Sequence, residues 1–207
     1  MSHDDVPFPP AEEETDSQDL AIGAPESIIE LSLAAARFVH GAVGIEIDQT
    51  SDTLSLVDHY LVEARGTLEE RPELVPLITR SVGAYFGEVI RPLLNGFWIV
   101  PSDDVHGWLV CSHDVFLSLN PVGAVYDALY GHRDHDGPSS ELRLDREDAA
   151  LVDQRLSLLP EVREEDFHLL TTRFDVVEIA VSALREAASR DGHQEVRFEL
   201  DDYLTTS

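Results

Sequence analysis

The sequence predicts an α+β fold in a single domain, with helices packed on a small antiparallel sheet of about four strands. Long segments with helical spacing of apolar residues flank a central stretch, residues 97–119, that consists of short apolar runs. The chain has 207 residues, of which 43% are hydrophobic and 27% are charged, and this composition suits one folded core. We expect residues 27–207 to form the domain and residues 1–26 to form a disordered acidic tail.

The predicted tail contains no lysine or arginine. Three prolines favour extended backbone, and few apolar side chains are present to be buried, so the tail is expected to stay solvated. A short anchor around Val6 and Phe8 that docks on a partner is the alternative. The acidic residues of the tail are Asp4, Asp5, Glu12, Glu13, Glu14, Asp16, Asp19 and Glu26.

Two helices are expected next. The first begins near Ser27, with Glu30 three residues later at the spacing of a capping box, and it ends at glycines near residue 41. Residues 45–47 then form a short strand or an extended turn. A second helix starts near Ser51.

The strongest helical pattern runs from about Pro72 to Leu94, where apolar residues form a wide stripe. Gly83 and Gly87 lie on one side of this helix, and each costs about 1 kcal/mol relative to alanine. We therefore expect another backbone to pass close over that side. The alternative is that the flattened side forms an interface with a partner chain.

Three short strands are expected at residues 97–100, 108–111 and 115–119, and the turn residues between them are typical of an antiparallel meander. Trp98 and Trp108 would lie on adjacent strands, in the core or at an edge. An exposed tryptophan pair would instead mark an interface. The candidate interface residues are therefore Gly83, Gly87, Trp98 and Trp108.

The C-terminal half returns to helices. Asn120 and Pro121 predict a helix start, with the asparagine as N-cap and the proline in the first turn. Further helices are expected at residues 145–158 and 164–189. Apolar and charged residues alternate over residues 196–200, which predicts a strand that joins the same sheet.

The formal net charge of −27 arises from 41 acidic and 14 basic residues, and every basic residue is an arginine. Such a charge repels phosphate backbones and anionic lipids, so we expect a protein partner, of basic character, and neither nucleic acid nor membrane. Mimicry of DNA is a more specific interpretation of this charge, and a device for solubility is the more common one. The absence of lysine rules out P-loop, Schiff-base and pyridoxal-phosphate chemistry. With Cys111 as the only cysteine, an intrachain disulfide and a cysteine-rich zinc site are ruled out as well.

The beginning of the chain lacks the pattern of a secretory signal, and no apolar run approaches the roughly 20 residues that span a bilayer. We therefore expect a cytoplasmic location.

The polar loop at residues 131–140 contains the densest cluster of metal-type ligands, which are His132, Asp134, His135 and Asp136. Imidazole and carboxylate groups suit zinc, manganese or iron. A metal site needs three or four converging ligands, however, and the sequence identifies no distant partner for the loop. A flexible polar loop is the preferred interpretation, and a metal-dependent hydrolase built on these four residues is the alternative function.

Other reactive patterns are weak. Ser112, His113 and Asp114 are neighbours in sequence, so their side chains point apart and cannot relay a proton. Charged residues on the apolar helices, such as Arg80 and Arg173, are expected to join helices as ion pairs. The sequence thus predicts no catalytic residue and no cofactor site.

Two segments, SVGAYFGEV at residues 81–89 and FLSLNPVG at residues 116–123, together with the tryptophan strand between them, resemble an uncharacterised family of bacterial proteins. The resemblance covers about residues 30 to 203. Some similar domains occur among bacterial immunity-type and other small interaction proteins. The resemblance implies an α+β domain without known catalytic residues.

These observations favour a non-enzymatic interaction or regulatory protein that uses an acidic surface to bind a partner protein. An immunity-like role is the most specific form of this hypothesis. The sequence predicts neither the identity of the partner nor an oligomeric state.

Overall fold

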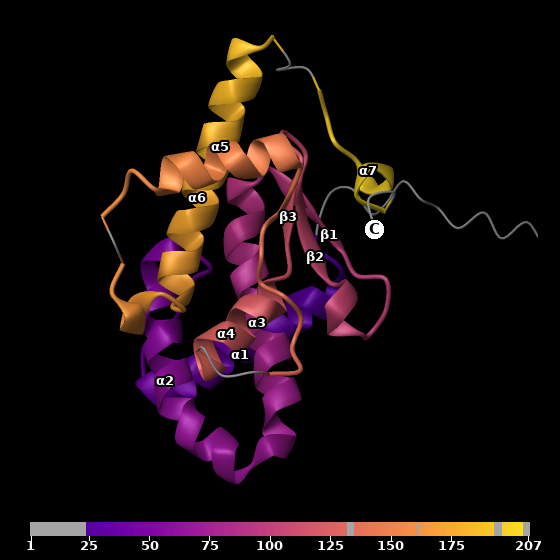
Figure 1. Cartoon of the computed structure of the whole chain (residues 1–207). Coiled ribbons are helices and arrows are strands. Elements are labelled where there is room, and N and C mark those ends of the chain that lie inside the picture. The colour runs from indigo at the N-terminus through magenta and orange to yellow at the C-terminus, as the bar shows by residue number, and fades with distance from the viewer. Residues whose placement is uncertain (1–23, 132–134, 161, 193–195, 205–207) are drawn as a thin grey trace, which may run out of the picture.

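The computed structural model describes residues 24–131, 135–160, 162–192 and 196–204. These residues form helices and a four-stranded antiparallel sheet, which confirms the α+β prediction (Figure 1). The helices are α1 (Glu26–Val43), α2 (Leu54–Glu70), α3 (Val75–Leu93), α4 (Pro121–Tyr130), α5 (Arg146–Leu156), α6 (Leu170–Arg190) and α7 (Leu200–Leu204). The strands are β1 (Gly96–Ile99), β2 (Leu109–Ser112), β3 (Leu117–Leu119) and β4 (Arg143–Leu144).

The sheet has the strand order β1-β2-β3-β4, and all neighbouring strands are antiparallel. Its first three strands confirm the predicted meander. The fourth strand is β4, which pairs Leu144 with Leu117, and the predicted strand at residues 196–200 is wrong. In that segment the Phe198 N–H donates to the His113 carbonyl oxygen at 2.9 Å, and α7 begins at Leu200. The apolar spacing there reflects packing on a sheet face, which needs no ladder of strand hydrogen bonds.

Both faces of the sheet are covered. Side chains alternate along a strand, so Trp98 of β1 faces the main core with α3, whereas Phe97 and Ile99 face the other way. On that second face they form a smaller core with Tyr203 of α7. Figure 1 shows α7 beyond the sheet, on the side away from α3. The Tyr203 hydroxyl donates to the carbonyl oxygen of Ser112 at 2.6 Å, so the C-terminal segment is tied to the sheet by a hydrogen bond as well as by packing.

The two glycines of α3 lie where other elements approach the helix closely. A Cβ built on Gly83 would lie 2.7 Å from Val122 Cγ2 of α4, and one built on Gly87 would lie 2.2 Å from the Trp98 ring. Close packing therefore explains both glycines.

Asn120 caps α4 as predicted, because its Oδ1 accepts hydrogen bonds from the backbone N–H groups of Val122 at 3.0 Å and of Gly123 at 3.2 Å.

The predicted cap of α1 and the predicted start of α6 are wrong. Helix α1 begins at Glu26 after Pro25, so Ser27 lies inside the first turn and does not cap the helix. Helix α6 begins at Leu170, whereas residues 164–166 form a short 3₁₀ turn. The reason is a distant side chain: Asp58 of α2 accepts hydrogen bonds from the backbone N–H groups of Leu170 at 2.7 Å and of Thr171 at 3.1 Å.

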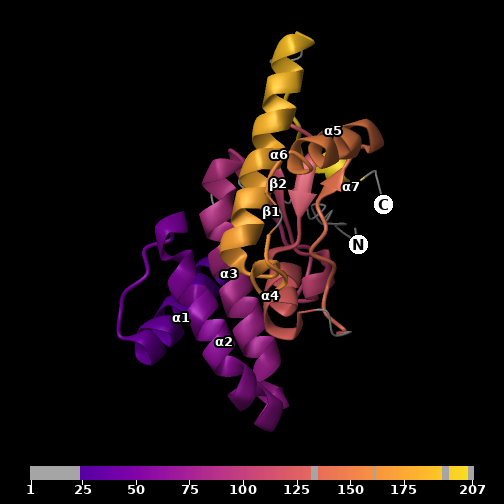
Figure 2. The ribbon, with the colours of Figure 1, turned by 60° about the vertical axis from the view of Figure 1, so that its left-hand side comes forward.

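Helix α6 has two different surroundings. Its first half packs against α2 and α4, and α5 crosses it further along. In the views of Figures 1 and 2, the last turns of α6 extend beyond α5 and the sheet. No helix of the described residues combines the length and apolar composition needed to cross a membrane.

Candidate functional site

The described part of the polar loop folds back onto α4. His135 Nε2 lies 3.0 Å from Asp127 Oδ1, and His135 Nδ1 accepts a hydrogen bond from the Gly137 N–H at 3.1 Å. Since Nδ1 acts as the acceptor, the proton of the neutral ring is on Nε2 and points to the carboxylate. The rings of Tyr126 and Tyr130 flank the imidazole. Both nitrogens of His135 are therefore engaged within the chain.

Asp127 is the centre of a larger polar cluster. The Ser140 hydroxyl donates to Asp127 Oδ2, and Arg173 Nη2 of α6 lies 3.0 Å from Ser140 Oγ and 3.5 Å from Asp127 Oδ2. Burial lowers the pKa of Arg173, while Asp127 and Glu141 act in the opposite direction. A Ser-His-Asp relay needs the imidazole between the other two groups. Here the carboxylate lies in the middle, so the cluster fastens the loop to α4 and α6.

The predicted metal ligands are not brought together by the described residues. His135 faces Asp127, and Asp136 is exposed, while His132 and Asp134 lie outside the described residues. No group of three metal-type ligands occurs in the part of the chain that the structure describes. The metal site therefore stays a prediction.

The four candidate interface residues lie inside the molecule. Trp98 is 4% exposed and Trp108 is 3% exposed, and Gly83 and Gly87 are buried against α4 and β1. Both indole N–H groups have internal acceptors: Trp98 donates to Glu88 Oε1 at 2.7 Å, and Trp108 donates to the Ser102 carbonyl oxygen at 2.8 Å. In these buried positions the four residues offer no surface to a partner.

The remaining reactive side chains are held in structural roles. Ser112 donates to the Leu94 carbonyl oxygen at 3.0 Å, and His113 Nδ1 lies 2.8 Å from the Phe198 carbonyl oxygen, so the two side chains have separate partners. Cys111 is fully buried, and this burial raises the pKa of its thiol to about 12. The thiolate required of a nucleophile is therefore disfavoured.

The arginines are largely occupied by groups of the same chain. Six form ion pairs with carboxylates, namely Arg71, Arg91, Arg155, Arg163, Arg173 and Arg185. Three more, Arg65, Arg80 and Arg190, donate hydrogen bonds to backbone carbonyl oxygens. Since acidic residues outnumber basic ones by 41 to 14, most carboxylates have no cationic side chain to pair with.

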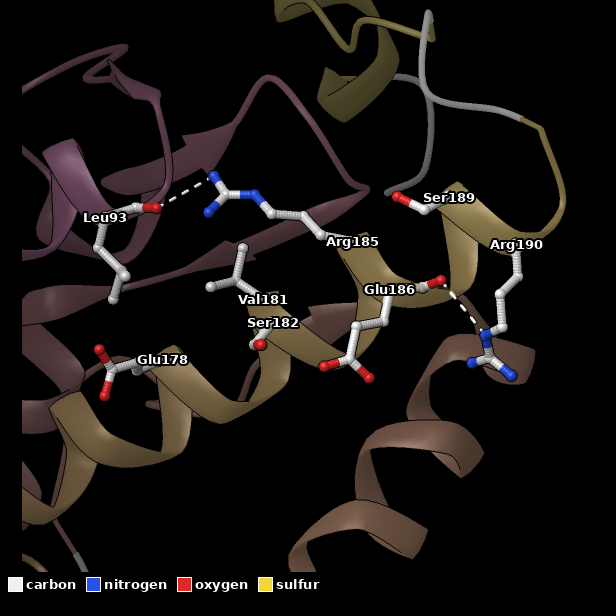
Figure 3. Close-up of a pocket in the computed structure, with 8 residues that line it drawn as sticks. All are labelled: Leu93, Glu178, Val181, Ser182, Arg185, Glu186, Ser189 and Arg190. Carbon is white, nitrogen blue, oxygen red and sulfur yellow. Dashed lines mark hydrogen bonds between the residues drawn. The ribbon is translucent and has the colours of Figure 1, made fainter.

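An open groove of about 600 Å³ runs along one face of α6 beside the end of α3 (Figure 3). Arg185 points across the groove, and its guanidinium donates to the Leu93 carbonyl oxygen at 3.1 Å. Arg190 turns back to the Glu186 carbonyl oxygen of its own helix at 3.3 Å. Both guanidinium groups are thus used internally, and nothing in the groove singles out an occupant.

A smaller pocket of about 180 Å³ lies on another side of the same end of α6. The β2–β3 turn, the start of α5, the last turns of α6 and the segment before α7 all contribute to its wall. Three aspartates line it, Asp114, Asp148 and Asp191, together with two aromatic rings, Phe116 and Phe198. We take this mixed acidic and apolar pocket as the candidate functional site.

The three aspartates differ in their partners. Asp114 pairs with Arg185 Nη2 at 2.6 Å and accepts a hydrogen bond from Asn95 Nδ2 at 2.9 Å. The side chains of Asp148 and Asp191 form no hydrogen bond or ion pair with the described residues. Burial, followed by repulsion from Asp145 and Glu147, raises the pKa of Asp148. The pocket thus contains carboxylates whose charge no described residue of the chain neutralises.

The sequence does not predict this pocket. Its lining residues come from four segments spread over residues 114–198, and no local spacing relates them. Asp148 is also an ordinary residue for the first turn of a helix, where an acidic side chain favours the helix dipole.

Comparisons of the chain with family models, with curated proteins and with solved structures found no match.

Proposed function

We propose that the protein is a non-enzymatic interaction protein that binds a basic partner protein through its acidic surface. The observation that carries this proposal is the use of the arginines: nine of them are bound to acceptors of the same chain, so they are not available to neutralise the excess of acidic residues, which number 41 against 14 basic ones. An immunity-like or regulatory role in the cytoplasm is the most specific form of the proposal.

The physical effect of this charge supports a basic protein as the partner. A strong negative field speeds the encounter with a positively charged surface and slows the approach of nucleic acid and anionic lipid. The side chains that could suggest catalysis support the same conclusion. The Asp127 carboxylate is shared by His135, Ser140 and Arg173, and the Cys111 thiol is buried, so these groups are occupied in holding the fold.

The proposal is tested by affinity capture from the source cells at low salt, followed by association kinetics with the purified partner. We expect a partner with a net positive charge and an association rate that falls at least tenfold between about 50 and 300 mM salt, because steering is screened over a Debye length of roughly 8–10 Å. An acidic partner, or an association rate that salt leaves unchanged, would contradict the proposal, as would repeated capture without any partner. Competition by duplex DNA for the same partner would indicate DNA mimicry.

A further inference from the structure

We propose that the pocket at the C-terminal end of α6 receives an arginine side chain of the partner protein. This inference rests on the proposed function, because it names the chemical group that anchors the basic partner. The pocket is defined by its three aspartates, Asp114, Asp148 and Asp191, and by the rings of Phe116 and Phe198.

The walls of the pocket match the two parts of an arginine side chain. Leu184, Ala187 and Ala188 of α6 line its apolar side, against which an aliphatic stem can pack. The rings of Phe116 and Phe198 also line the pocket and lie 5.8 Å apart at an interplanar angle of 60°. One face of Phe116 is stacked on Tyr203 at 4.9 Å, so the part of each ring that lines the pocket is what can attract a guanidinium. A volume of about 180 Å³ suits a single side chain, and it is too small for a helix or a nucleotide.

Two carboxylates of the pocket can accept a cation from outside. Asp148 and Asp191 have no partner among the described residues, and no basic side chain lines the described pocket. Arg185 is committed to Asp114 and to the Leu93 carbonyl oxygen, and Arg190 is bound to the Glu186 carbonyl oxygen. A guanidinium entering the pocket would therefore meet two carboxylates, Asp148 and Asp191, that no described arginine occupies.

The geometry favours an organic cation over a metal ion. The described residues contain no group of three carboxylate, imidazole or thiolate ligands close enough to bind one ion, and much of the wall here is aromatic or aliphatic. Arginine is favoured over lysine because its planar guanidinium carries five donors and stacks on aromatic rings, whereas an ammonium is a compact, strongly hydrated charge.

The inference is tested by titrating the isotope-labelled full chain with N-acetyl-arginine methylamide and recording amide shifts by nuclear magnetic resonance. We expect saturable shifts of the Asp148, Asp191 and Phe198 amides. The matching citrulline compound has nearly the same shape without the charge, and we expect at least tenfold weaker binding from it. Equal shifts with both compounds, or shifts that do not saturate at these amides, would overturn the inference.

Variants locate the binding site. The double variant D148N/D191N should lose at least fivefold in affinity for the arginine compound. The control D153N/D175N removes the same charge from exposed positions of α5 and α6 that do not line the pocket, and it should bind as the wild type does. If the two double variants lose affinity equally, the effect is one of overall charge and the inference is wrong.

The pH dependence gives a second readout. Because a guanidinium favours the ionised form of Asp148, affinity should fall as the pH is lowered through the raised pKa of that carboxyl. The single variant D148N should lose this part of the pH dependence. A wild-type affinity that is constant down to pH 4 would contradict the role of Asp148.

The captured partner separates this inference from the proposed function. If D148N/D191N binds a basic partner as tightly as D153N/D175N does, the pocket is not the anchor, and the proposed function still stands. If no basic partner binds any form of the protein, the proposed function fails, and the arginine titration alone decides whether the pocket recognises a guanidinium.

Discussion

The two ends of α6 use aspartate in opposite ways. At the N-terminal end Asp58 is 6% exposed, and it accepts hydrogen bonds from the Leu170 N–H, the Thr171 N–H and the Thr171 hydroxyl at 2.7, 3.1 and 2.9 Å. At the C-terminal end Asp148 and Asp191 line a pocket without a hydrogen bond or ion pair to the described residues. The first arrangement provides an acceptor for backbone N–H groups at the start of the helix, which have no partner within the helix. The second leaves carboxylates without a cationic partner.

The two kinds of aspartate are expected to contribute differently to stability and to binding. A buried carboxylate with every lone pair directed at a donor fixes the position of an element. A carboxylate that the fold leaves without a counterion contributes little or nothing to stability, and it is available to a ligand. The comparison predicts that substitutions at the two ends of α6 have different effects on the free energy of unfolding.

The largest effect is expected for Asp58→Ala. This variant removes the cap of α6 and leaves buried donors without an acceptor, so we expect a loss of about 2–4 kcal/mol in the free energy of unfolding, measured with urea. Asp153→Ala, at an exposed position of α5, is the control and should change stability by less than about 0.5 kcal/mol. If D58A lowered the free energy of unfolding no more than D153A does, the Asp58 cap would not stabilise the N-terminal end of α6.

A smaller effect is expected when each end loses an arginine. Arg173→Met removes a side chain that is 18% exposed and leaves Asp127 without its cation, so we expect a loss of about 2 kcal/mol. Arg185→Met breaks a pair whose members are 37% and 36% exposed, for which about 0.5 kcal/mol is expected. Urea unfolding of both variants measures the difference. A larger loss of stability in R185M than in R173M would contradict the comparison between the two ends.

The smallest effect, with the opposite sign, is expected for Asp148→Asn. Since burial disfavours the ionised form of Asp148, and Asp145 and Glu147 repel it as well, neutralising this carboxylate should raise stability by a few tenths of a kcal/mol. Thermal unfolding at low and high salt checks the cause, because screening should shrink the gain. A loss above about 1 kcal/mol would make Asp148 a structural residue and would remove the contrast between the two ends.

The features that the sequence predicted correctly are local. The cap of α4 depends on adjacent residues, Asn120 and Pro121, and the meander depends on short runs separated by turns. The glycines of α3 indicated a close approach, but nothing in their spacing identified Val122 and Trp98 as the neighbours. Local signals thus gave elements and some caps, and they did not give the contacts between elements.

The errors and omissions share a physical cause. The start of α6 was misplaced because its cap is 112 residues away in the sequence, and no pattern within the helix reports it. The alternation of apolar and charged residues over 196–200 reflects burial of one side of the segment. A strand and an extended segment that lies on a sheet both show this pattern. The acidic pocket was missed because four separate segments form it, and each of its aspartates resembles an ordinary surface residue.

The separation between Asp58 and Leu170 also constrains the order of folding. The carboxylate is synthesised long before the helix that it caps, and closing a loop of this length has a high entropic cost that is repaid only when both ends have docked. We therefore expect α6 to form late and together with its contact to α2. During synthesis on the ribosome, the early helices would hold this carboxylate in water until the backbone donors emerge.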